Sequence, residues 1–309
     1  MGSNSCLQSP RIIAIVNPIS GKGKGLALAN QMSKLALSRG MNFSLGGSSF
    51  QEIYTCLEEL KVNSHPTFVV VIGGDGLTHH ALQFLVGTPH CLCVFPAGTG
   101  NDISRTLNTF GYGIEEFLDL LVEEEPRSID VARVTSLSSM NSGHSRYFLQ
   151  VLTIGFDSKV NARANRFKTI KGSFKYTIAT IFELLRLKAD RMKVTFSDST
   201  VERALLMIDI GNGPTYGGGM KILPTADPFD GLLNMLIVEP VSRFELLRVF
   251  PKVFFGKHLE HPAVTHHIST SLTIEGDSLV YADGEKIGFL PIDIEVIPKG
   301  LNVLIGSGK

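Results

Sequence analysis

The sequence predicts an α/β protein in two parts, an open parallel sheet followed by a β-rich domain. Between residues 11 and 100, a strand-like apolar run, a glycine-rich loop and a helical stretch recur three times, which is typical of a parallel sheet. After about residue 130, short strand-like runs follow one another at the spacing of a mostly antiparallel domain. The chain has 309 residues, which is enough for two hydrophobic cores.

The first part contains continuous apolar runs of the kind found where helices cover both faces of a parallel sheet. We predict strands over residues 11–16, 68–72 and 91–95, and helices over residues 26–39, 51–61 and 77–86. Ligands of such sheets bind at the loops beyond the carboxyl ends of the strands. The glycine-rich loops that follow the predicted strands are therefore the candidate binding site.

The second part alternates short apolar runs with turn sequences. Strand-like runs cover residues 128–135, 147–154, 192–196, 205–210, 232–238, 271–275 and 292–297, and helical stretches cover residues 176–188 and 243–255. We place the boundary near residue 130, which gives a first domain over residues 10–130 and a second over residues 131–292.

Composition excludes several classes of protein. Lysine plus arginine equals aspartate plus glutamate at 29 each, so we expect no nucleic-acid partner. The four cysteines, Cys6, Cys56, Cys91 and Cys93, show neither a disulfide framework nor a zinc spacing, which favours a reducing, cytoplasmic location. No apolar run reaches the roughly 18 residues that span a bilayer, so we expect no transmembrane segment.

The first loop, residues 17–25, contains three glycines and two lysines between a strand and a helix. Glycine lets backbone N–H groups approach an anion, and the start of the following helix adds a favourable dipole. The spacing is not that of a Walker A loop. Taken alone, the loop is equally well explained as a tight turn.

The second loop, Gly73-Gly74-Asp75-Gly76, directly follows a buried strand. Glycines on both sides of Asp75 leave its carboxylate exposed at the edge of the sheet, where it can contact Mg²⁺ or a substrate hydroxyl. The alternative is an aspartate that only caps the following helix.

The third loop, residues 96–102, offers the side chains of Thr99 and Asn101 for hydrogen bonds. In order, Asn-Pro-x-Ser-Gly-x-Gly, Gly-Gly-Asp-Gly and Pro-x-Gly-Thr-Gly-Asn-Asp resemble the diacylglycerol kinase catalytic domain family. That family includes bacterial lipid kinases and the sphingosine and ceramide kinases. Later segments agree over almost the whole chain: Gly155-Phe156-Asp157, Asn212 with Gly217-Gly218-Gly219, Pro224-x-Ala226, Asp230-Gly231-Leu232-Leu233, and Tyr281-Ala282-Asp283-Gly284-Glu285.

The resemblance implies a Rossmann-like nucleotide-binding domain followed by a β-rich sandwich that carries the lipid, with residues 293–309 returning to the first domain. It implies an ATP-dependent lipid kinase, with diacylglycerol as the default acceptor. The residues that would hold ATP are Asn17, Ser20, Gly21, Lys22, Gly73, Gly74, Asp75, Gly76, Thr99 and Asn101. Asp230, the carbonyl of Leu232 and Asp227 would bind Mg²⁺. Glu285 would accept the proton of the lipid hydroxyl, unless Asp75 does so.

Three departures from the family pattern affect details. Leu77 stands where threonine is common, His80 replaces an acid, and no clear nucleotide-contacting side chain occurs in residues 46–49. The alternatives left open are a kinase for a sphingoid base or another lipid alcohol, an enzyme like NAD kinase, and a lipid-binding regulator without catalysis. The sequence also leaves open whether the protein is a homodimer.

A basic segment is the candidate contact with the inner face of a membrane, because a kinase with a lipid substrate and no transmembrane segment requires peripheral association. Residues 158–182 contain Lys159, Arg163, Arg166, Lys168, Lys171 and Lys175, one acid-free run of cations before Glu183. Each cation near an anionic surface contributes about 1 kcal/mol to binding. A solvated helix face is the competing interpretation.

Overall fold

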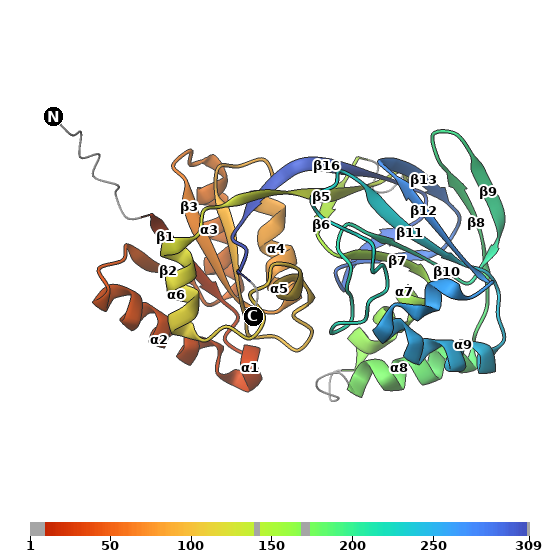
Figure 1. The fold of residues 1–309 in the computed structure, drawn as a ribbon, viewed down its shortest axis with the longest axis horizontal. Helices are drawn as coiled ribbons and strands as arrows, with labels where there is room; N and C mark the ends of the chain where they lie inside the picture. The colour runs from red at the N-terminus through yellow and green to blue at the C-terminus, as the bar shows by residue number, and fades with distance from the viewer. Residues whose placement is uncertain (1–9, 139–142, 168–173, 308–309) are drawn as a thin grey trace. The chain divides into compact units, whose positions relative to one another are not determined.

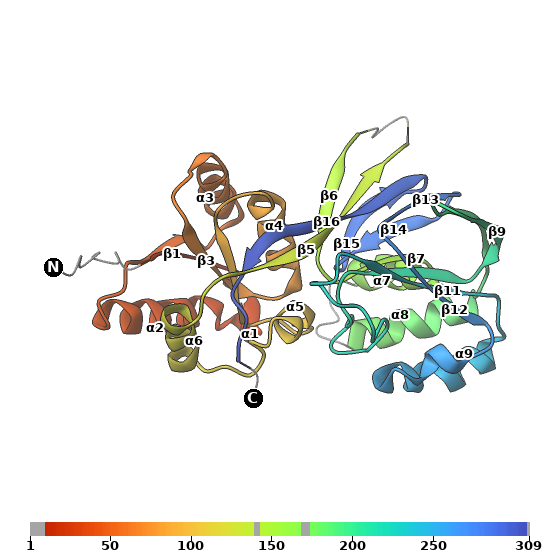
Figure 2. The ribbon, with the colours of Figure 1, turned by 45° about the horizontal axis from the view of Figure 1, so that its top comes forward.

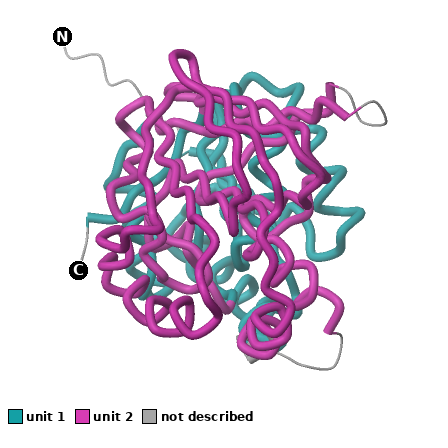
Figure 3. The backbone as a smooth tube through the Cα atoms, turned by 90° about the vertical axis from the view of Figure 1, so that its right-hand side faces the viewer, with its two compact units in different colours: residues 1–98, 107–127, 301–309 teal, residues 99–106, 128–300 magenta. Residues whose placement is uncertain are grey.

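The computed structural model describes residues 10–138, 143–167 and 174–307. The chain divides into two compact units (Figure 3). Unit 1 comprises Met1–Gly98, Leu107–Arg127 and Leu301–Lys309, and unit 2 comprises Thr99–Thr106 and Ser128–Gly300. Each unit is described by itself below.

Unit 1 is built on a parallel sheet. Its strands are β1 (Arg11–Val16), β2 (Phe43–Gly47), β3 (Thr67–Gly73) and β4 (Cys91–Pro96), arranged in the order β2-β1-β3-β4. The end of β16 (Ile292–Val303) adds a short parallel pairing, in which Asn302 and Val303 lie opposite Cys91 and Leu92. The predicted strands over residues 11–16, 68–72 and 91–95 are confirmed as β1, β3 and β4.

Helices cover both faces of this sheet (Figures 1 and 2). On one face, α2 (Gly25–Ser38) and α6 (Ile114–Glu123) pack on the strands through a cluster that includes Met32 and Phe117. On the other face lie α3 (Phe50–Val62) and α4 (Asp75–Leu85). The α/β class predicted from the sequence is therefore confirmed, whereas β2 and α6 were not predicted. β2 is a short edge strand ending in two glycines, and so lacks the long apolar run that identified its neighbours.

Unit 2 is a sandwich of two sheets. The six-stranded sheet has the order β12-β11-β10-β7-β14-β15 and is antiparallel wherever its register is defined. Its strands are β7 (Val151–Gly155), β10 (Met207–Gly211), β11 (Leu233–Val238), β12 (Val264–Ser269), β14 (Leu279–Ala282) and β15 (Glu285–Phe289). The opposing sheet contains β5 (Arg127–Ser136), β6 (Ser145–Phe148), β8 (Asp190–Thr195), β9 (Thr200–Leu205), β13 (Ser271–Glu275) and β16. Buried residues from both sheets, such as Ile208 and Ile274, form one core between them.

The outer face of the six-stranded sheet is covered by helices. They are α7 (Phe156–Arg166), α8 (Phe174–Leu185), α9 (Arg243–Val249) and the 3₁₀ turns η1 (Phe250–Phe255) and η2 (Lys257–Glu260). A second apolar cluster contains Ala164 of α7, Ala179 of α8 and Leu246 of α9, so these helices share one core (Figure 2). No helix among the residues that the structure describes is both long and apolar enough to cross a bilayer.

Several predicted elements of unit 2 were wrong in their limits, and the strand predicted over residues 292–297 continues to Val303. The run over residues 147–154 is two strands, β6 and β7, and the run over residues 205–210 joins the end of β9 to β10. The helix over residues 243–255 ends at Val249, and η1 continues the chain with Pro251 in its first turn. The helix α7 was not predicted, because its sequence is mostly polar and basic.

Candidate functional site

The first glycine loop begins at Asn17, immediately after β1, and Asn17 accepts hydrogen bonds from the residues that follow it. Ser20–Gly23 forms a single helical turn, α1, which was not predicted. The side-chain oxygen Oδ1 of Asn17 accepts the N–H of Ile19 at 3.2 Å, and its carbonyl accepts the N–H of Ser20 at 3.0 Å. A Cβ at Gly25 would lie only 2.2 Å from the carbonyl oxygen of Asn17, so α2 can begin here only with glycine.

Backbone hydrogen bonds join the beginnings of the three loops within unit 1. The N–H of Gly21 donates to the carbonyl of Ala97 at 2.6 Å, and the N–H of Ala97 donates to the carbonyl of Gly73 at 2.8 Å. The N–H of Gly23 donates to the carbonyl of Ile19 at 3.1 Å. The N–H groups of Gly21 and Gly23 thus have protein acceptors. The predicted role of Lys22 concerns a side chain outside the described part of the structure.

The second loop places Asp75 at the N-terminus of α4. Gly74 is the N-cap and Asp75 is the first helical residue, so Asp75 does not occupy the N-cap position itself. The half-buried carboxylate lies where the helix dipole favours negative charge. A Cβ at Gly73 would lie 3.0 Å from Cδ2 of Leu77, which shows that Leu77 packs over the glycine that begins the loop.

His80 lies in an aromatic cluster. Its ring centroid is 5.3 Å from that of Phe50 and 5.5 Å from that of Phe84. The histidine that departs from the family's acid therefore packs between α3 and α4, which accounts for an aromatic side chain at this position.

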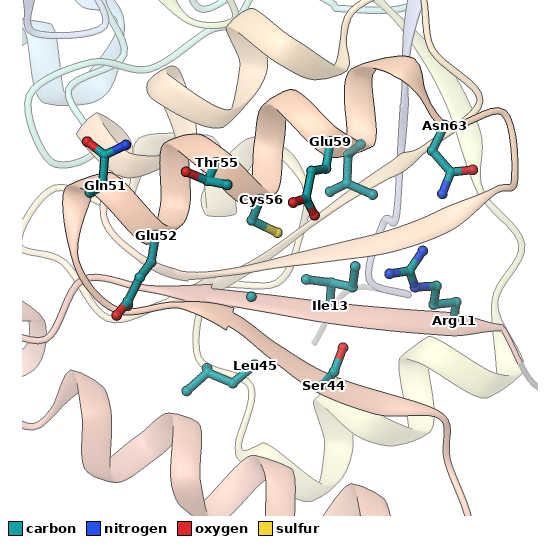
Figure 4. Close-up of a pocket in the computed structure, with 12 residues that line it drawn as sticks. Arg11, Ile13, Ser44, Leu45, Gln51, Glu52, Thr55, Cys56, Glu59 and Asn63 are labelled. Carbon is teal, nitrogen blue, oxygen red and sulfur yellow. The ribbon is translucent and has the colours of Figure 1, made fainter.

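A cavity of about 520 Å³ in unit 1 lies apart from the predicted site residues (Figure 4). It runs between α3 and the strands β1 and β2, and Arg11, Cys56 and Glu59 are among its lining residues. None of the residues predicted to bind ATP lines it.

The third loop continues into unit 2, where Asp102 holds a glycine turn. Asn101 adopts a left-handed conformation with φ of 56°, and Asp102 begins the short helix α5 (Asp102–Thr106). The carboxylate of Asp102 accepts the N–H groups of Gly218 at 2.7 Å and Gly219 at 2.6 Å. Burial raises the pKa of Asp102, although these bonds oppose the shift. Sequence reasoning assigned Asp102 no role. The sequence features that could have indicated this contact are the aspartate that ends the third loop and the later run Gly217-Gly218-Gly219.

Asp130 organises the loop that was predicted to bind Mg²⁺. This buried carboxylate accepts the N–H of Gly231 at 2.7 Å and the N–H of Lys299 at 2.8 Å. The carbonyl of Pro228 also accepts the N–H of Asp130, at 2.7 Å. Asp130 was missed because it lies in a predicted strand more than 90 residues before its partners.

The predicted ligands Asp227 and Asp230 both lie in this loop, and the side chain of each closes a turn with the residue two positions later. Oδ1 of Asp227 accepts the N–H of Phe229 at 3.1 Å, and Oδ1 of Asp230 accepts the N–H of Leu232 at 2.9 Å. Desolvation raises the pKa of Asp230, and the charges of Asp227 and Asp130 raise it further. Among the described residues, no three His, Cys, Asp or Glu side chains converge as a metal site.

A two-residue turn presents Glu285. Asp283 and Gly284 have φ of 50° and 84°, and Ala282 pairs with Glu285 across the hairpin of β14 and β15. The carboxylate of Asp283 accepts the N–H groups of Leu149, Gln150 and Val151 at 2.9, 2.9 and 3.3 Å. Asp283 therefore fixes the turn, and Glu285 follows it as an exposed side chain.

Tyr281 and Arg166 share the environment of Glu285. Burial raises the pKa of Tyr281, a hydrogen bond with Asn165 lowers it, and the charges of Glu285 and Arg166 act in opposite directions. Asn165 also donates to the carbonyl of Gly284 at 3.5 Å. The end of α7 thus lies against the Glu285 turn.

Two acids lie close to each other in unit 2: Asp157, which is half-buried in the first turn of α7, and Asp209, which is fully buried in β10. Burial raises the pKa of Asp157 to about 6. It raises the pKa of Asp209 well above its ordinary value, and the charge of Asp157 adds to that shift. Both carboxylate oxygens of Asp209 are buried, and neither has a hydrogen-bond partner among the described residues. Asp157 belongs to the Gly155-Phe156-Asp157 segment, whereas nothing in the sequence singled out Asp209.

Comparisons with known proteins agree with this arrangement. The profile of the diacylglycerol kinase catalytic domain matches residues 11–134, and that of the YegS C-terminal NAD kinase beta sandwich-like domain matches residues 150–305. A Mycobacterium tuberculosis protein named diacylglycerol kinase is 35% identical over 299 residues, which cover 95% of this chain and 94% of the relative. A Staphylococcus aureus diacylglycerol kinase is 25% identical, with 94% and 90% coverage.

Solved structures show the same fold. A diacylglycerol kinase from Bacillus anthracis superposes with a TM-score of 0.69 at 20% identity, covering 96% of this chain and 97% of that chain. Yeast NADH kinase complexed with NADH gives a TM-score of 0.54 at 9% identity, with 97% and 85% coverage. The sequence matches extend through both units and include every motif loop described above. The chain therefore belongs to the diacylglycerol kinase catalytic domain family of lipid kinases.

Proposed function

We propose that the protein transfers the γ-phosphoryl group of ATP to the hydroxyl of diacylglycerol, which gives ADP and phosphatidic acid. The observation that carries this proposal is the 35% identity, over 95% of the chain, to a protein named diacylglycerol kinase. The three glycine loops and the acid-bearing turns occur together in this one sequence.

The ATP site that we propose lies at the carboxyl ends of β1 and β3. It uses Asn17, Ser20, Gly21 and Lys22 of the first loop, Gly73, Gly74, Asp75 and Gly76 of the second, and Thr99 and Asn101 of the third. The hydrogen bonds from Gly21 to Ala97 and from Ala97 to Gly73 support a joint role for these loops, because they hold the loop beginnings together. Asp75 would contact Mg²⁺ bound to the nucleotide, because carboxylate oxygens are ligands of that cation.

The residues of the Asp227–Leu232 loop fit a Mg²⁺ ion. Asp227 and Asp230 each use one carboxylate oxygen for a turn, which leaves the other oxygen for a ligand. The carbonyl of Leu232 is a further oxygen donor, and water completes such sites because Mg²⁺ keeps part of its hydration shell. A bound ion would neutralise the carboxylates that crowd this loop. We expect Asp230→Ala to lower thermal stability more in Mg²⁺ than in EDTA. Equal losses in the two buffers would argue against the ion.

The reaction requires a base at the acceptor hydroxyl. As the lipid oxygen bonds to the γ-phosphorus and ADP departs, the hydroxyl proton passes to a carboxylate, either Glu285 or Asp75. Exposure at the end of a fixed turn supports Glu285, which a substrate can reach. We keep both residues as candidates.

Two other functions are less well supported. An enzyme like NAD kinase rests on a likeness to yeast NADH kinase that shows the fold alone, at 9% identity. A regulator without catalysis would not need Asp75, Asp230 and Glu285 together. A sphingoid base remains an alternative acceptor within the lipid kinase class.

The test is an assay with radiolabelled ATP and Mg²⁺. Diacylglycerol, sphingosine and NAD are offered separately, the two lipids in mixed micelles. We expect label in phosphatidic acid and not in NADP. Label in sphingosine phosphate alone would replace the acceptor, and Mg·ATP binding without product from any acceptor would favour the regulator.

A further inference from the structure

The outer side of α9 and η1 carries large apolar side chains that no described part of the chain covers. We call residues 243–257 the α9–η1 surface. Phe244 is 85% exposed, Phe255 is 74% exposed and Leu247 is 52% exposed, and α9 contains no buried residue. Figures 1 and 2 both show α9 in the helical layer of unit 2, on the side away from the sandwich core.

The inner side of the same segment anchors it. Val253 is buried in the apolar cluster beneath the helices, and Leu246 packs against that cluster. Ser242 caps α9 by accepting the N–H of Glu245 at 3.2 Å, and Glu245 pairs with His261 at 3.2 Å. The exposed aromatic side chains are therefore not required to hold the segment in place.

Four of the five charged side chains of the α9–η1 surface are cations, and the fifth is Glu245, whose side chain is 43% exposed. Arg243, Arg248, Lys252 and Lys257 are exposed, and none forms an ion pair with a described residue. The sole acid of the segment, Glu245, is engaged with His261. Four cations thus lie among the exposed aromatic rings of a protein whose formal net charge is zero.

In the basic segment expected to bind membranes, residues 158–182, some of the cations do form ion pairs. Lys159 pairs with Asp190 at 2.6 Å, and Arg163 pairs with Glu183. Lys168 and Lys171 lie outside the described residues, as does the side chain of Lys175. Acids from outside the segment therefore neutralise part of the charge that the sequence displayed there.

We propose that the α9–η1 surface docks on an anionic lipid bilayer. Aromatic and aliphatic side chains enter the boundary between headgroups and acyl chains, while arginine and lysine attract anionic headgroups. A protein partner fits less well, because lysine is depleted at protein–protein interfaces. The inference rests on the proposed function, since the lipid acceptor is what brings the enzyme to a bilayer.

The neighbouring helix α8 extends the same kind of surface. Ile181 is 55% exposed and Leu185 is 61% exposed, and Arg186 and Lys188 follow them as exposed cations without an ion pair among the described residues. Because α8 and α9 pack on one core cluster, both belong to the layer that covers the six-stranded sheet (Figure 2).

The test is sedimentation of the full chain with phosphatidylcholine vesicles, with and without about a third of phosphatidylglycerol, at low and high salt. The apolar variant is Phe244→Ser with Phe255→Ser, and the charge variant is Arg248→Gln with Lys252→Gln. The matched control, Val62→Ser with Lys61→Gln, alters an equally exposed pair at the end of α3 in unit 1.

We expect the charge variant to lose about 25-fold in affinity for anionic vesicles at low salt, because each of its two cations contributes about fivefold, and little at high salt. The apolar variant should lose at least about tenfold at both salt concentrations. The control should bind like the wild type. Circular dichroism and melting temperature should be unchanged in all three variants.

Binding by both surface variants within about twofold of the wild type would overturn the proposal. So would a wild-type protein that ignores both kinds of vesicle, or one that forms a dimer which the variants break, since the occupant would then be a second copy. Phosphorylation of a short-chain diacylglycerol dispersed in water should be equal in wild type and variants. Its absence in the wild type would count against the proposed function, and vesicle binding would still decide this inference.

Discussion

At the scale of single residues, the aspartates of the motif loops and of the strand that supports them divide into two groups. Asp102, Asp130 and Asp283 are almost fully buried, and each accepts at least two backbone N–H groups. Asp227 and Asp230 keep a carboxylate oxygen beyond their turns. Some of these aspartates therefore hold a loop in place by accepting backbone N–H groups, and others keep an oxygen for a ligand. The sequence pattern alone does not distinguish the two roles.

The first prediction concerns Asp75. Replacement by asparagine keeps the shape of the side chain at the start of α4 and removes its charge. If Asp75 contacts the nucleotide-bound Mg²⁺, kcat should fall by about 100-fold or more, because such charge stabilisation contributes several kcal/mol. Steady-state kinetics with diacylglycerol measures the effect. An unchanged melting temperature with near wild-type kcat would remove Asp75 from the mechanism.

A second prediction separates the two candidate bases. Glu285→Gln should retain binding of ATP and lipid but lose most of kcat if Glu285 accepts the proton. Arg166 lies in the same environment, so Arg166→Gln serves as a comparison that changes a neighbouring charge without removing a base. If Glu285→Gln instead raises KM for lipid and leaves kcat intact, Glu285 is a binding residue and Asp75 becomes the candidate base.

At the scale of elements, the hairpin of β14 and β15 fixes the break between the strands β6 and β7. The carboxylate of Asp283 takes the N–H groups of Leu149, Gln150 and Val151, which interrupts the apolar run that we predicted as one strand. The same contact fixes the turn that presents Glu285. Strand limits and site geometry thus depend on one residue.

Asp283→Asn tests this dependence. Asparagine tolerates the left-handed backbone at this position, so the change removes mainly the charged acceptor. We expect a loss of about 2–4 kcal/mol in the free energy of unfolding, together with a lower kcat as the turn loosens. Urea denaturation measures the first effect and the kinase assay the second. Glu285→Gln, which changes an exposed side chain, should leave the free energy of unfolding within about 0.5 kcal/mol. A stable Asp283→Asn protein would show that the turn does not need its carboxylate.

What the sequence could predict follows from the range of the interactions. The strands β1, β3 and β4 are buried on both faces, so their apolar runs carry the signal locally. The edge strand β2 and the polar helix α7 gain their structure from neighbours, and local patterns missed both. Asp130 and Asp102 were missed because their partners lie about 100 residues away, at a separation that no single-sequence pattern encodes.

At the scale of the whole molecule, the half-buried Asp157 and the fully buried Asp209 link the stability of unit 2 to pH. Neither has a cation among the causes that shift its pKa, and burial dominates both shifts. A carboxyl group whose pKa is raised by folding holds its proton more tightly in the folded state than in the unfolded chain. Folding therefore becomes less favourable once the pH exceeds the unfolded value of about 3.9.

The last prediction follows from that sign. As pH rises from about 4 toward 6 and beyond, the unfolded chain releases protons that folded Asp157 and Asp209 retain, so the free energy of unfolding should decrease. Asp209→Asn removes one of the two ionisations while keeping the volume of the side chain. At pH 8 the variant should be more stable than wild type by at least about 1 kcal/mol, and at pH 4 the two should be nearly equal. Urea denaturation across this range measures the difference, with exposed Asp198→Asn as the control. A constant offset between Asp209→Asn and wild type at every pH would mean that the buried pair does not titrate as the structure indicates.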